Sequence, residues 1–298
     1  MTRISIAALL VFFCCVAPHA QQQLRGFKTL DEDLAMHMVN FRLPDTSGKT
    51  QELKEYAGSK VIVLVVQGNG CPIVRQSIPY FEEMMAEYGP KGVAFLYINS
   101  NDFDTQDVPS IRAEAAEYHA TIPILVDSDH AVAHALHLER TAESFAVDPK
   151  TWKILYRGMA DDRFEYGLQR SSPKRFWLKE VLDDFLAGKE VTTPSTVAKG
   201  CLMDLPELRG DVSFPNEVLP ILERKCLECH RRSGEKTLTE FSAENQTRWL
   251  PTLRDVLVTK RMNAEHCGAT GKDVHLNKAD VQTILSWLSA AETKHIAN

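Results

Sequence analysis

Hydrophobic residues divide the chain into a first region of alternating strands and helices and a second region of helices alone. The run 61–66 is aliphatic without interruption, which predicts a strand buried on both faces. Further strands are expected at 92–99, 122–126, 143–148 and 153–157, and helices at 73–88, 108–119, 131–138 and 173–186. This alternation predicts an α/β domain over 38–190, with a parallel-rich sheet flanked by helices.

The composition changes after residue 190. Thr, Pro, Ser and Gly dominate 191–210, which predicts a linker. Helical spacing then returns without strand patterns, and Asn277 is suited to cap the last helix. We therefore expect a small all-α domain over 211–298, with helices at 216–225, 249–259 and 278–291.

The N-terminus resembles an export signal. Arg3 precedes an apolar run from Ile4 to Val16, and small residues continue to Ala20. The run is too short for an ordinary transmembrane helix, and no later segment is apolar enough to span a bilayer. We expect 1–20 to be a signal peptide, 21–37 to be a polar arm, and the protein to be periplasmic or secreted.

Charge and cysteine content narrow the function. The 298 residues carry a net charge of −6, which disfavours nucleic acid as a partner but permits a basic redox protein. Seven cysteines are present, and removal of 1–20 would leave five of them. An odd number in an oxidising compartment predicts at least one free or reactive thiol.

Residues 226–230 read Cys-Leu-Glu-Cys-His, the attachment pattern of a c-type haem. Cys226 and Cys229 would form the thioethers, and His230 would ligate the iron. Met262 is the candidate sixth ligand, with His266 and His275 as competitors and an open position as a further option. The alternatives are a zinc site, to which His266 and Cys267 could contribute, and a simple dithiol pair.

Two other cysteines are candidates for thiol chemistry. Cys71 lies between the buried strand 61–66 and the start of a helix, where the helix dipole and free N–H groups stabilise a thiolate. The alternative is an inert buried cysteine. Cys201, in the linker, could resolve a disulfide with Cys71 if the linker folds back; otherwise it is a free thiol or part of a static disulfide with Cys267.

Several stretches resemble known families. Region 38–190 resembles a redoxin domain of the peroxiredoxin-related AhpC/TSA type, within the thioredoxin-like superfamily. Region 211–290 resembles the cytochrome c-like domain often fused behind such redoxins in secreted bacterial proteins. The matching stretches are Phe41–Asp45, Gly70–Ile73, Gly92–Phe95 and Asp161–Arg163 in the first region, and Val218–Leu222, Cys226–Arg231, Lys260–Met262 and Ile284–Trp287 in the second.

The chain also departs from these families. Val74 occupies the place of the second cysteine of a thioredoxin Cys-x-x-Cys pair, so a local disulfide is excluded. Gly68 and Leu64 replace the Thr or Ser and the Pro that precede a peroxidatic cysteine, which argues against peroxidase activity. Ala142 stands where relatives have a cis-proline, and Asn263 follows Met262 where relatives have proline.

Together these features predict an exported redox protein that transfers electrons through one covalently bound haem c. Thiol or peroxide reduction at Cys71 would accompany electron transfer, with a redox protein as partner and a small thiol or peroxide as substrate. The alternative is a catalytically silent redoxin-like binding or scaffold module, followed by a haem- or zinc-stabilised domain.

Overall fold

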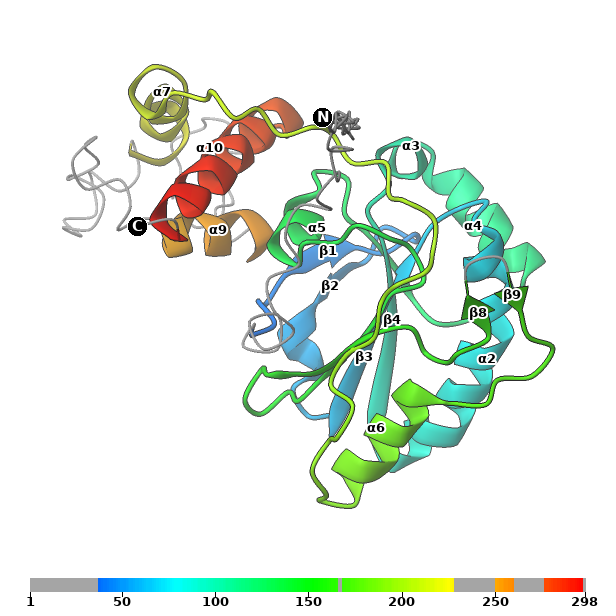
Figure 1. Cartoon of the computed structure of the whole chain (residues 1–298). Helices are drawn as coiled ribbons and strands as arrows, with labels where there is room; N and C mark the ends of the chain where they lie inside the picture. The colour runs from blue at the N-terminus through cyan, green and yellow to red at the C-terminus, as the bar shows by residue number, and fades with distance from the viewer. Residues whose placement is uncertain (1–36, 166–167, 228–249, 260–275, 297–298) are drawn as a thin grey trace, which may run out of the picture.

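A five-stranded sheet forms the centre of the protein (Figure 1). The computed structural model describes residues 37–165, 168–227, 250–259 and 276–296. The strand order is β5-β4-β3-β6-β7. The strands are β3 (Val61–Gln67), β4 (Val93–Asn99), β5 (Ile124–Val126), β6 (Ser144–Val147) and β7 (Ile154–Gly158).

The sheet is mixed, which corrects the expectation of a parallel-rich sheet. β3, β4 and β5 run parallel to one another, whereas β6 is antiparallel to both β3 and β7. The antiparallel pairing of β6 with β7 follows from the short connection between them, because a parallel pair needs a crossover of a dozen or more residues.

Alternate residues of β3 enter two different cores, because successive side chains of a strand point to opposite faces. Val61, Val63 and Val65 pack with side chains of α2, α4 and α6. Ile62 and Leu64 enter the core on the other face, where α5 and the β1–β2 hairpin contribute. These elements are α2 (Pro72–Tyr88), α4 (Val108–Glu117), α5 (Ala131–Ala135), α6 (Trp177–Leu186), β1 (Arg42–Pro44) and β2 (Thr50–Glu52).

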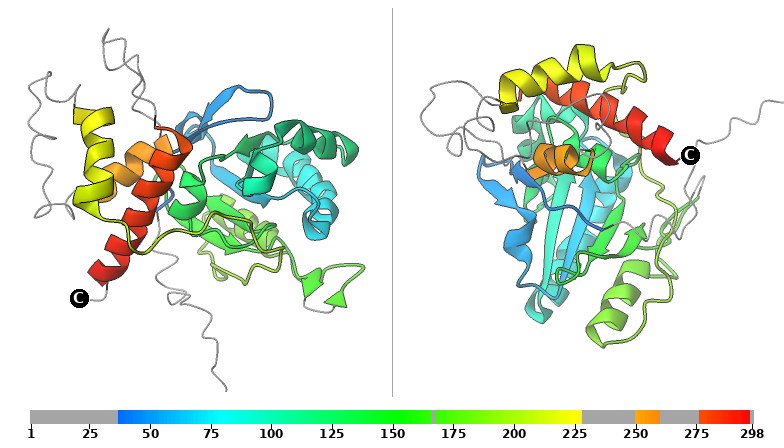
Figure 2. Two further views of the ribbon diagram at one scale, coloured as in Figure 1. Left: turned by 90° about the horizontal axis from the view of Figure 1, so that it is seen from above. Right: turned by 90° about the vertical axis from the view of Figure 1, so that its left-hand side faces the viewer.

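The C-terminal helices continue the core on the α5 side. Both α9 and α10 contact α5, and all three contribute to one apolar cluster with the sheet (Figures 1 and 2). The helical elements are η3 (Phe214–Val218), α7 (Leu219–Leu222), η4 (Glu223–Leu227), α9 (Leu250–Thr259) and α10 (Lys278–Ile296). The predicted cap of the last helix is confirmed, since Asn277 Oδ1 accepts the Asp280 N–H at 2.8 Å.

Residues 194–204, within the predicted linker, cross the surface of the first region as an extended segment that we call the strap (Figure 1). At its beginning, Ser195 forms a bridge with Arg157 at the edge strand β7. Further on, Leu202 forms an antiparallel bridge with Arg140, which lies just before β6. The strap is therefore joined to the first region at two separate points, at β7 and at the segment before β6.

Short elements complete the described chain: α3 (Asp102–Thr105), η1 (Leu53–Tyr56), η2 (Gly89–Lys91), β8 (Phe164–Glu165) and β9 (Leu168–Gln169). Periodicity does not predict such short elements, because they contain too few residues to establish a repeat.

Within the described residues, no helix combines the length and apolar character needed to cross a membrane.

Candidate active site

Cys71 lies where the sequence predicts it, at the junction between β3 and α2. It is the N-cap residue of α2, and Pro72 occupies the first helical position. The proline suits that position, because its missing N–H would have no helical partner there. The Cys71 side chain is only 4 % exposed. A helix N-terminus therefore faces a sulfur that is almost completely desolvated.

Two buried carboxylates hold the turn that leads into Cys71. Asp104 accepts the Asn69 N–H at 2.9 Å, and Glu114 accepts the Gly70 N–H at 2.8 Å. Arg75, on the first turn of α2, forms an ion pair with Glu114 at 2.6 Å. Sequence reasoning missed both acids. The available signal was that Asp104 follows the carboxyl end of β4, which adjoins the carboxyl end of β3.

Thr141 places a hydroxyl between Cys71 and Cys201. The hydroxyl lies 3.1 Å from Cys71 Sγ as a donor, and it accepts the backbone N–H of Cys201 at 3.0 Å. The Thr141 N–H in turn donates to the Cys201 carbonyl at 2.9 Å. One residue therefore both holds the strap and stabilises negative charge on Cys71.

The two candidate thiols lie in direct contact, with 2.7 Å between Cys71 Sγ and Cys201 Sγ. A disulfide bond is about 2.05 Å long, so bond formation requires a shift of less than about 1 Å. Cys201 is exposed, whereas Cys71 is buried beneath it. The strap thus brings together two of the residues singled out from the sequence, although 130 positions separate them.

Gly200 makes this approach possible. A Cβ atom at this position would lie 1.7 Å from the carbonyl oxygen of Thr141. No side chain fits there without moving the backbone of one segment away from the other. The glycine before Cys201 is therefore required by close packing and not by an unusual φ angle.

Two effects of opposite sign act on the pKa of Cys71. Burial among Val74, Ile78 and Met159 raises the pKa of Cys71, but hydrogen bonds from Cys201, Thr141 and nearby backbone N–H groups outweigh burial and hold it below its ordinary value. Burial and the adjacent Cys71 sulfur raise the pKa of Cys201 to about 11. In the reduced pair, Cys71 therefore loses its proton more readily than Cys201.

Comparison with known proteins agrees with this architecture. The sequence model of the family described as Redoxin matches residues 34–168. These residues form a redoxin domain. Its thioredoxin-like fold has a mixed sheet flanked by helices, as found here. No curated protein matches the chain.

Two solved structures are similar to part of this chain. A hypothetical protein from Sinorhizobium meliloti is 27% identical, with a TM-score of 0.52, and the match covers 58% of this chain and 94% of that chain. An uncharacterized conserved protein from Geobacillus kaustophilus is 26% identical, with a TM-score of 0.52, covering 58% of this chain and 92% of that chain.

Outside the redoxin domain, the structure describes only one of the predicted haem-site residues. Cys226 lies in η4, buried in the apolar cluster that includes Leu222, Leu253 and Trp287. Burial raises the pKa of its thiol to about 11. Cys229, His230 and Met262 lie outside the described residues, as do the other proposed zinc ligands. The part of the chain that is described contains no group of three or more potential metal ligands.

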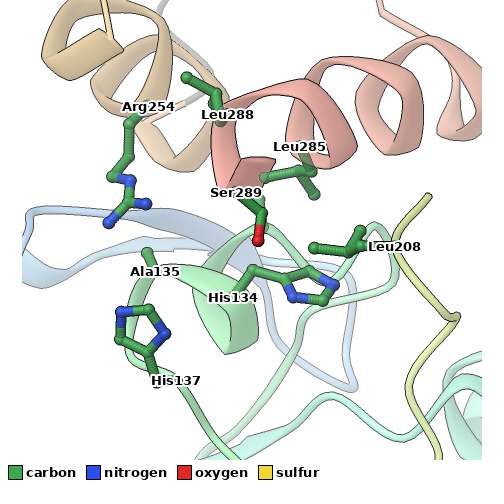
Figure 3. A pocket seen from close by; sticks show the side chains of 9 residues that line it. His134, Ala135, His137, Leu208, Arg254, Leu285, Leu288 and Ser289 are labelled. Carbon is green, nitrogen blue, oxygen red and sulfur yellow. The ribbon is translucent and has the colours of Figure 1, made fainter. Parts of the chain in front are cut away.

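A small pocket of about 60 Å³ lies between α5 and the C-terminal helices (Figure 3). His134, Leu208, Arg254 and Leu288 contribute to its lining, which includes no residue of the Cys71 site. Burial, followed by neighbouring cationic groups, lowers the pKa of His134 to about 4, so this imidazole is neutral at pH 7. The pocket is part of the helix packing and is too small for a haem.

We predict that Thr141→Val makes the Cys71–Cys201 pair a weaker oxidant. A hydrogen bond to a charged group contributes about 1.5–3 kcal/mol, and for a two-electron couple 1.4 kcal/mol corresponds to about 30 mV. Since the lost bond stabilises the thiolate of the reduced state, the reduction potential should fall by roughly 30–60 mV. Equilibration with glutathione buffers measures this potential.

The control is Thr192→Val, at an exposed threonine in the segment that leads to the strap. It should leave the potential unchanged. An unchanged or higher potential in Thr141→Val would show that the Thr141 hydroxyl does not stabilise the Cys71 thiolate.

Proposed function

We propose that the protein is a thiol–disulfide oxidoreductase in which Cys71 and Cys201 alternate between a dithiol and a disulfide. The observation that carries this proposal is the 2.7 Å contact between the two sulfurs. The opposite pKa shifts of the pair add a direction to the chemistry. A stabilised thiolate favours the reduced state, which makes the corresponding disulfide an oxidant.

The exposed sulfur of the disulfide is the one that a substrate reaches. A substrate thiolate attacks Cys201 Sγ, the Cys71–Cys201 bond breaks, and Cys71 leaves as a thiolate. A leaving group of low pKa speeds this step. The result is a mixed disulfide between the substrate and Cys201, with Cys71 held by Thr141 and the helix N-terminus.

A second substrate thiol completes the exchange. It attacks the substrate sulfur of the mixed disulfide, and Cys201 leaves and takes up one proton. The substrate becomes a disulfide, the pair gains two electrons, and one proton passes to solvent. The reverse sequence reduces a substrate disulfide, but the raised pKa of Cys201 leaves little thiolate to start it.

Thiols are favoured over peroxides as substrates. Gly68 provides no hydroxyl beside Cys71, and the Cys71 sulfur lies beneath Cys201. A Cβ atom at Gly68 would approach Thr141 Cγ2 to 2.5 Å, so the hydroxyl-bearing residue of peroxiredoxins would not fit at this position without rearrangement.

We also propose that the helical region binds one haem c through Cys226 and Cys229, with His230 as an axial ligand and Met262 as the candidate for the other. The support is the sequence motif and the apolar surroundings of Cys226. A thioether carries no charge, so burial among leucines suits it better than the thiolate that a zinc ion requires. When bound, haem c supplies one-electron transfer.

Export to the periplasm or the cell exterior belongs to the same proposal. It rests on the signal-like residues 1–20, and an oxidising compartment would preserve a Cys71–Cys201 disulfide.

For the thiol pair, we predict that oxidised wild-type protein gains two free thiols when it oxidises one equivalent of dithiothreitol. Cys71→Ser and Cys201→Ser should each abolish this gain, because either change removes the disulfide. Thiol counting with peptide mass spectrometry measures the outcome. Cys267→Ser is the matched control and should behave as wild type; a silent redoxin module would gain no thiols in any of the four proteins.

For the haem, we predict covalent attachment when the protein is produced together with haem-attachment machinery. The intact mass should rise by one haem, and the pyridine haemochrome should show the α band of two thioethers. Cys226→Ala should shift that band towards the position for one thioether. If the protein instead contains zinc and shows no Soret band, this part of the proposal is wrong.

A further inference from the structure

Large apolar side chains are exposed at only three positions among the residues that the structure describes. Phe103 is 78 % exposed, Leu202 70 % and Val197 58 %. Leu202 follows Cys201 directly in the strap. Because burial of such side chains is favourable, their exposure beside a reactive sulfur needs a reason.

Phe103 lies near the strap segment that carries Leu202, although the two residues are far apart in sequence. The N–H of Asp102 donates to the carbonyl of Asp204 at 2.7 Å, and the N–H of Asp204 donates to Asn101 Oδ1 at 3.1 Å. Phe103 follows Asp102 directly, and Leu202 lies two residues before Asp204. Three residues of extended chain span at most about 10 Å, so Phe103 is tethered near the part of the strap that carries Cys201 and Leu202.

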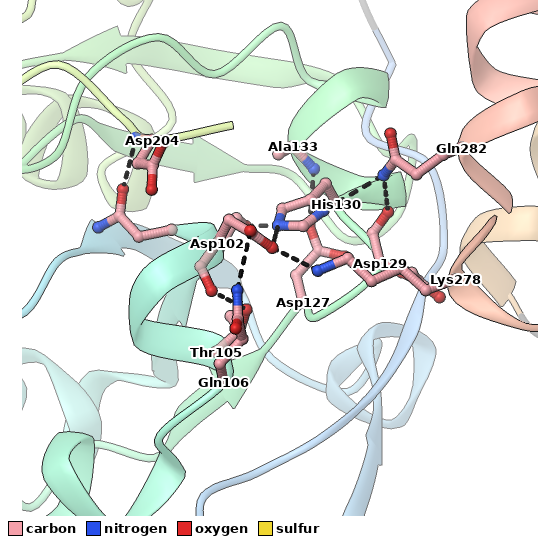
Figure 4. A network of polar contacts seen from close by, with 12 residues as sticks. Asp102, Thr105, Gln106, Asp127, Asp129, His130, Ala133, Asp204, Lys278 and Gln282 are labelled. Atoms are coloured by element: carbon pink, nitrogen blue, oxygen red, sulfur yellow. Dashed lines mark hydrogen bonds and ion pairs between the residues drawn. The ribbon is translucent and has the colours of Figure 1, made fainter. Parts of the chain in front are cut away.

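The backbone below this surface is firmly anchored (Figure 4). The Asp102 carboxylate forms an ion pair with Lys278 of α10 and lies 3.3 Å from Nε2 of the buried His130. Gln282 of α10 donates to the carbonyl of Asp129 at 3.0 Å. Phe103 is therefore presented on a fixed support rather than on a loose loop.

We propose that Phe103 and Leu202 form an apolar docking surface for a polypeptide substrate whose reactive cysteine is flanked by apolar side chains. The inference rests on the thiol–disulfide exchange proposed above and names its substrate class. Cys201 is the exposed sulfur of the pair and Leu202 adjoins it, so a substrate thiol that reaches Cys201 comes next to Leu202 and near Phe103. A small thiol covers neither of them, whereas an extended peptide covers both.

The test compares two short peptides with two cysteines each. In one, Leu and Phe flank the cysteines; in the other, Ser replaces them. The full-length protein, with Cys71 and Cys201 oxidised, is mixed with each reduced peptide or with dithiothreitol. The second-order rate constant for reduction of the pair is measured for wild type, for Phe103→Ser with Leu202→Ser, and for Val197→Ser as the matched control.

The apolar peptide should react at least about tenfold faster than the Ser peptide with wild type, because burying even one large apolar side chain contributes more than a factor of ten in affinity. The double variant should lose this preference, while its rate with dithiothreitol and its reduction potential stay at wild-type values. Val197→Ser should retain the preference, since Val197 lies on the other side of Cys201 along the strap, towards the bridge with β7.

Three results would overturn the docking surface alone. Equal rates for the two peptides with wild type would show that no apolar docking exists. A double variant that keeps the preference would place docking elsewhere. A double variant that slows equally with both peptides and with dithiothreitol would mean that the side chains only position the strap. If the wild-type pair reacts with neither dithiothreitol nor peptide, the proposed exchange itself fails, and the docking surface fails with it.

Discussion

The antiparallel contact between the strap and the segment around Thr141 is the constraint on which the site depends. It holds Cys201 over Cys71 by hydrogen bonds between the Cys201 backbone and both the backbone and the hydroxyl of Thr141, with no side chain at Gly200 to keep the two segments apart. Without this contact, the redoxin domain has a single buried thiol and no partner for it. With it, two distant cysteines become one redox centre.

The same contact makes the two sulfurs unequal. Cys71 is covered, faces a helix N-terminus and accepts hydrogen bonds, whereas Cys201 is exposed and stays protonated. The accessible atom is therefore the one that substrates attack, and the inaccessible atom is the better leaving group. The strap also continues to Asp204, which is hydrogen-bonded to Asn101 and Asp102, and Asp102 forms an ion pair with Lys278 of α10. Residues 101–102 therefore contact both the strap that carries Cys201 and the C-terminal helices.

Sequence reasoning was most successful where a property is local. The buried strand β3, the helix that starts at Pro72, the cap at Asn277 and the position of Cys71 at a helix start all follow from short-range patterns. It was less successful with long-range pairing. The buried carboxylates Asp104 and Glu114 look like surface acids, and the mixed sheet depends on where β6 pairs. The strap has no periodicity, so its position over Cys71 stayed one of several options for Cys201. The haem ligands Cys229, His230 and Met262 lie outside the described residues and stay predictions.

The most direct test of the central claim is the disulfide pattern of the oxidised protein, because it reports the Cys71–Cys201 pairing without any assumption about substrate. Proteolysis under non-reducing conditions, with free thiols alkylated first, followed by mass spectrometry, identifies the linked peptides. We predict that the peptide containing Cys71 is joined to the peptide containing Cys201, and that both separate on reduction. A link between Cys71 or Cys201 and any other cysteine, or alkylation of both as free thiols after oxidation, would contradict the account.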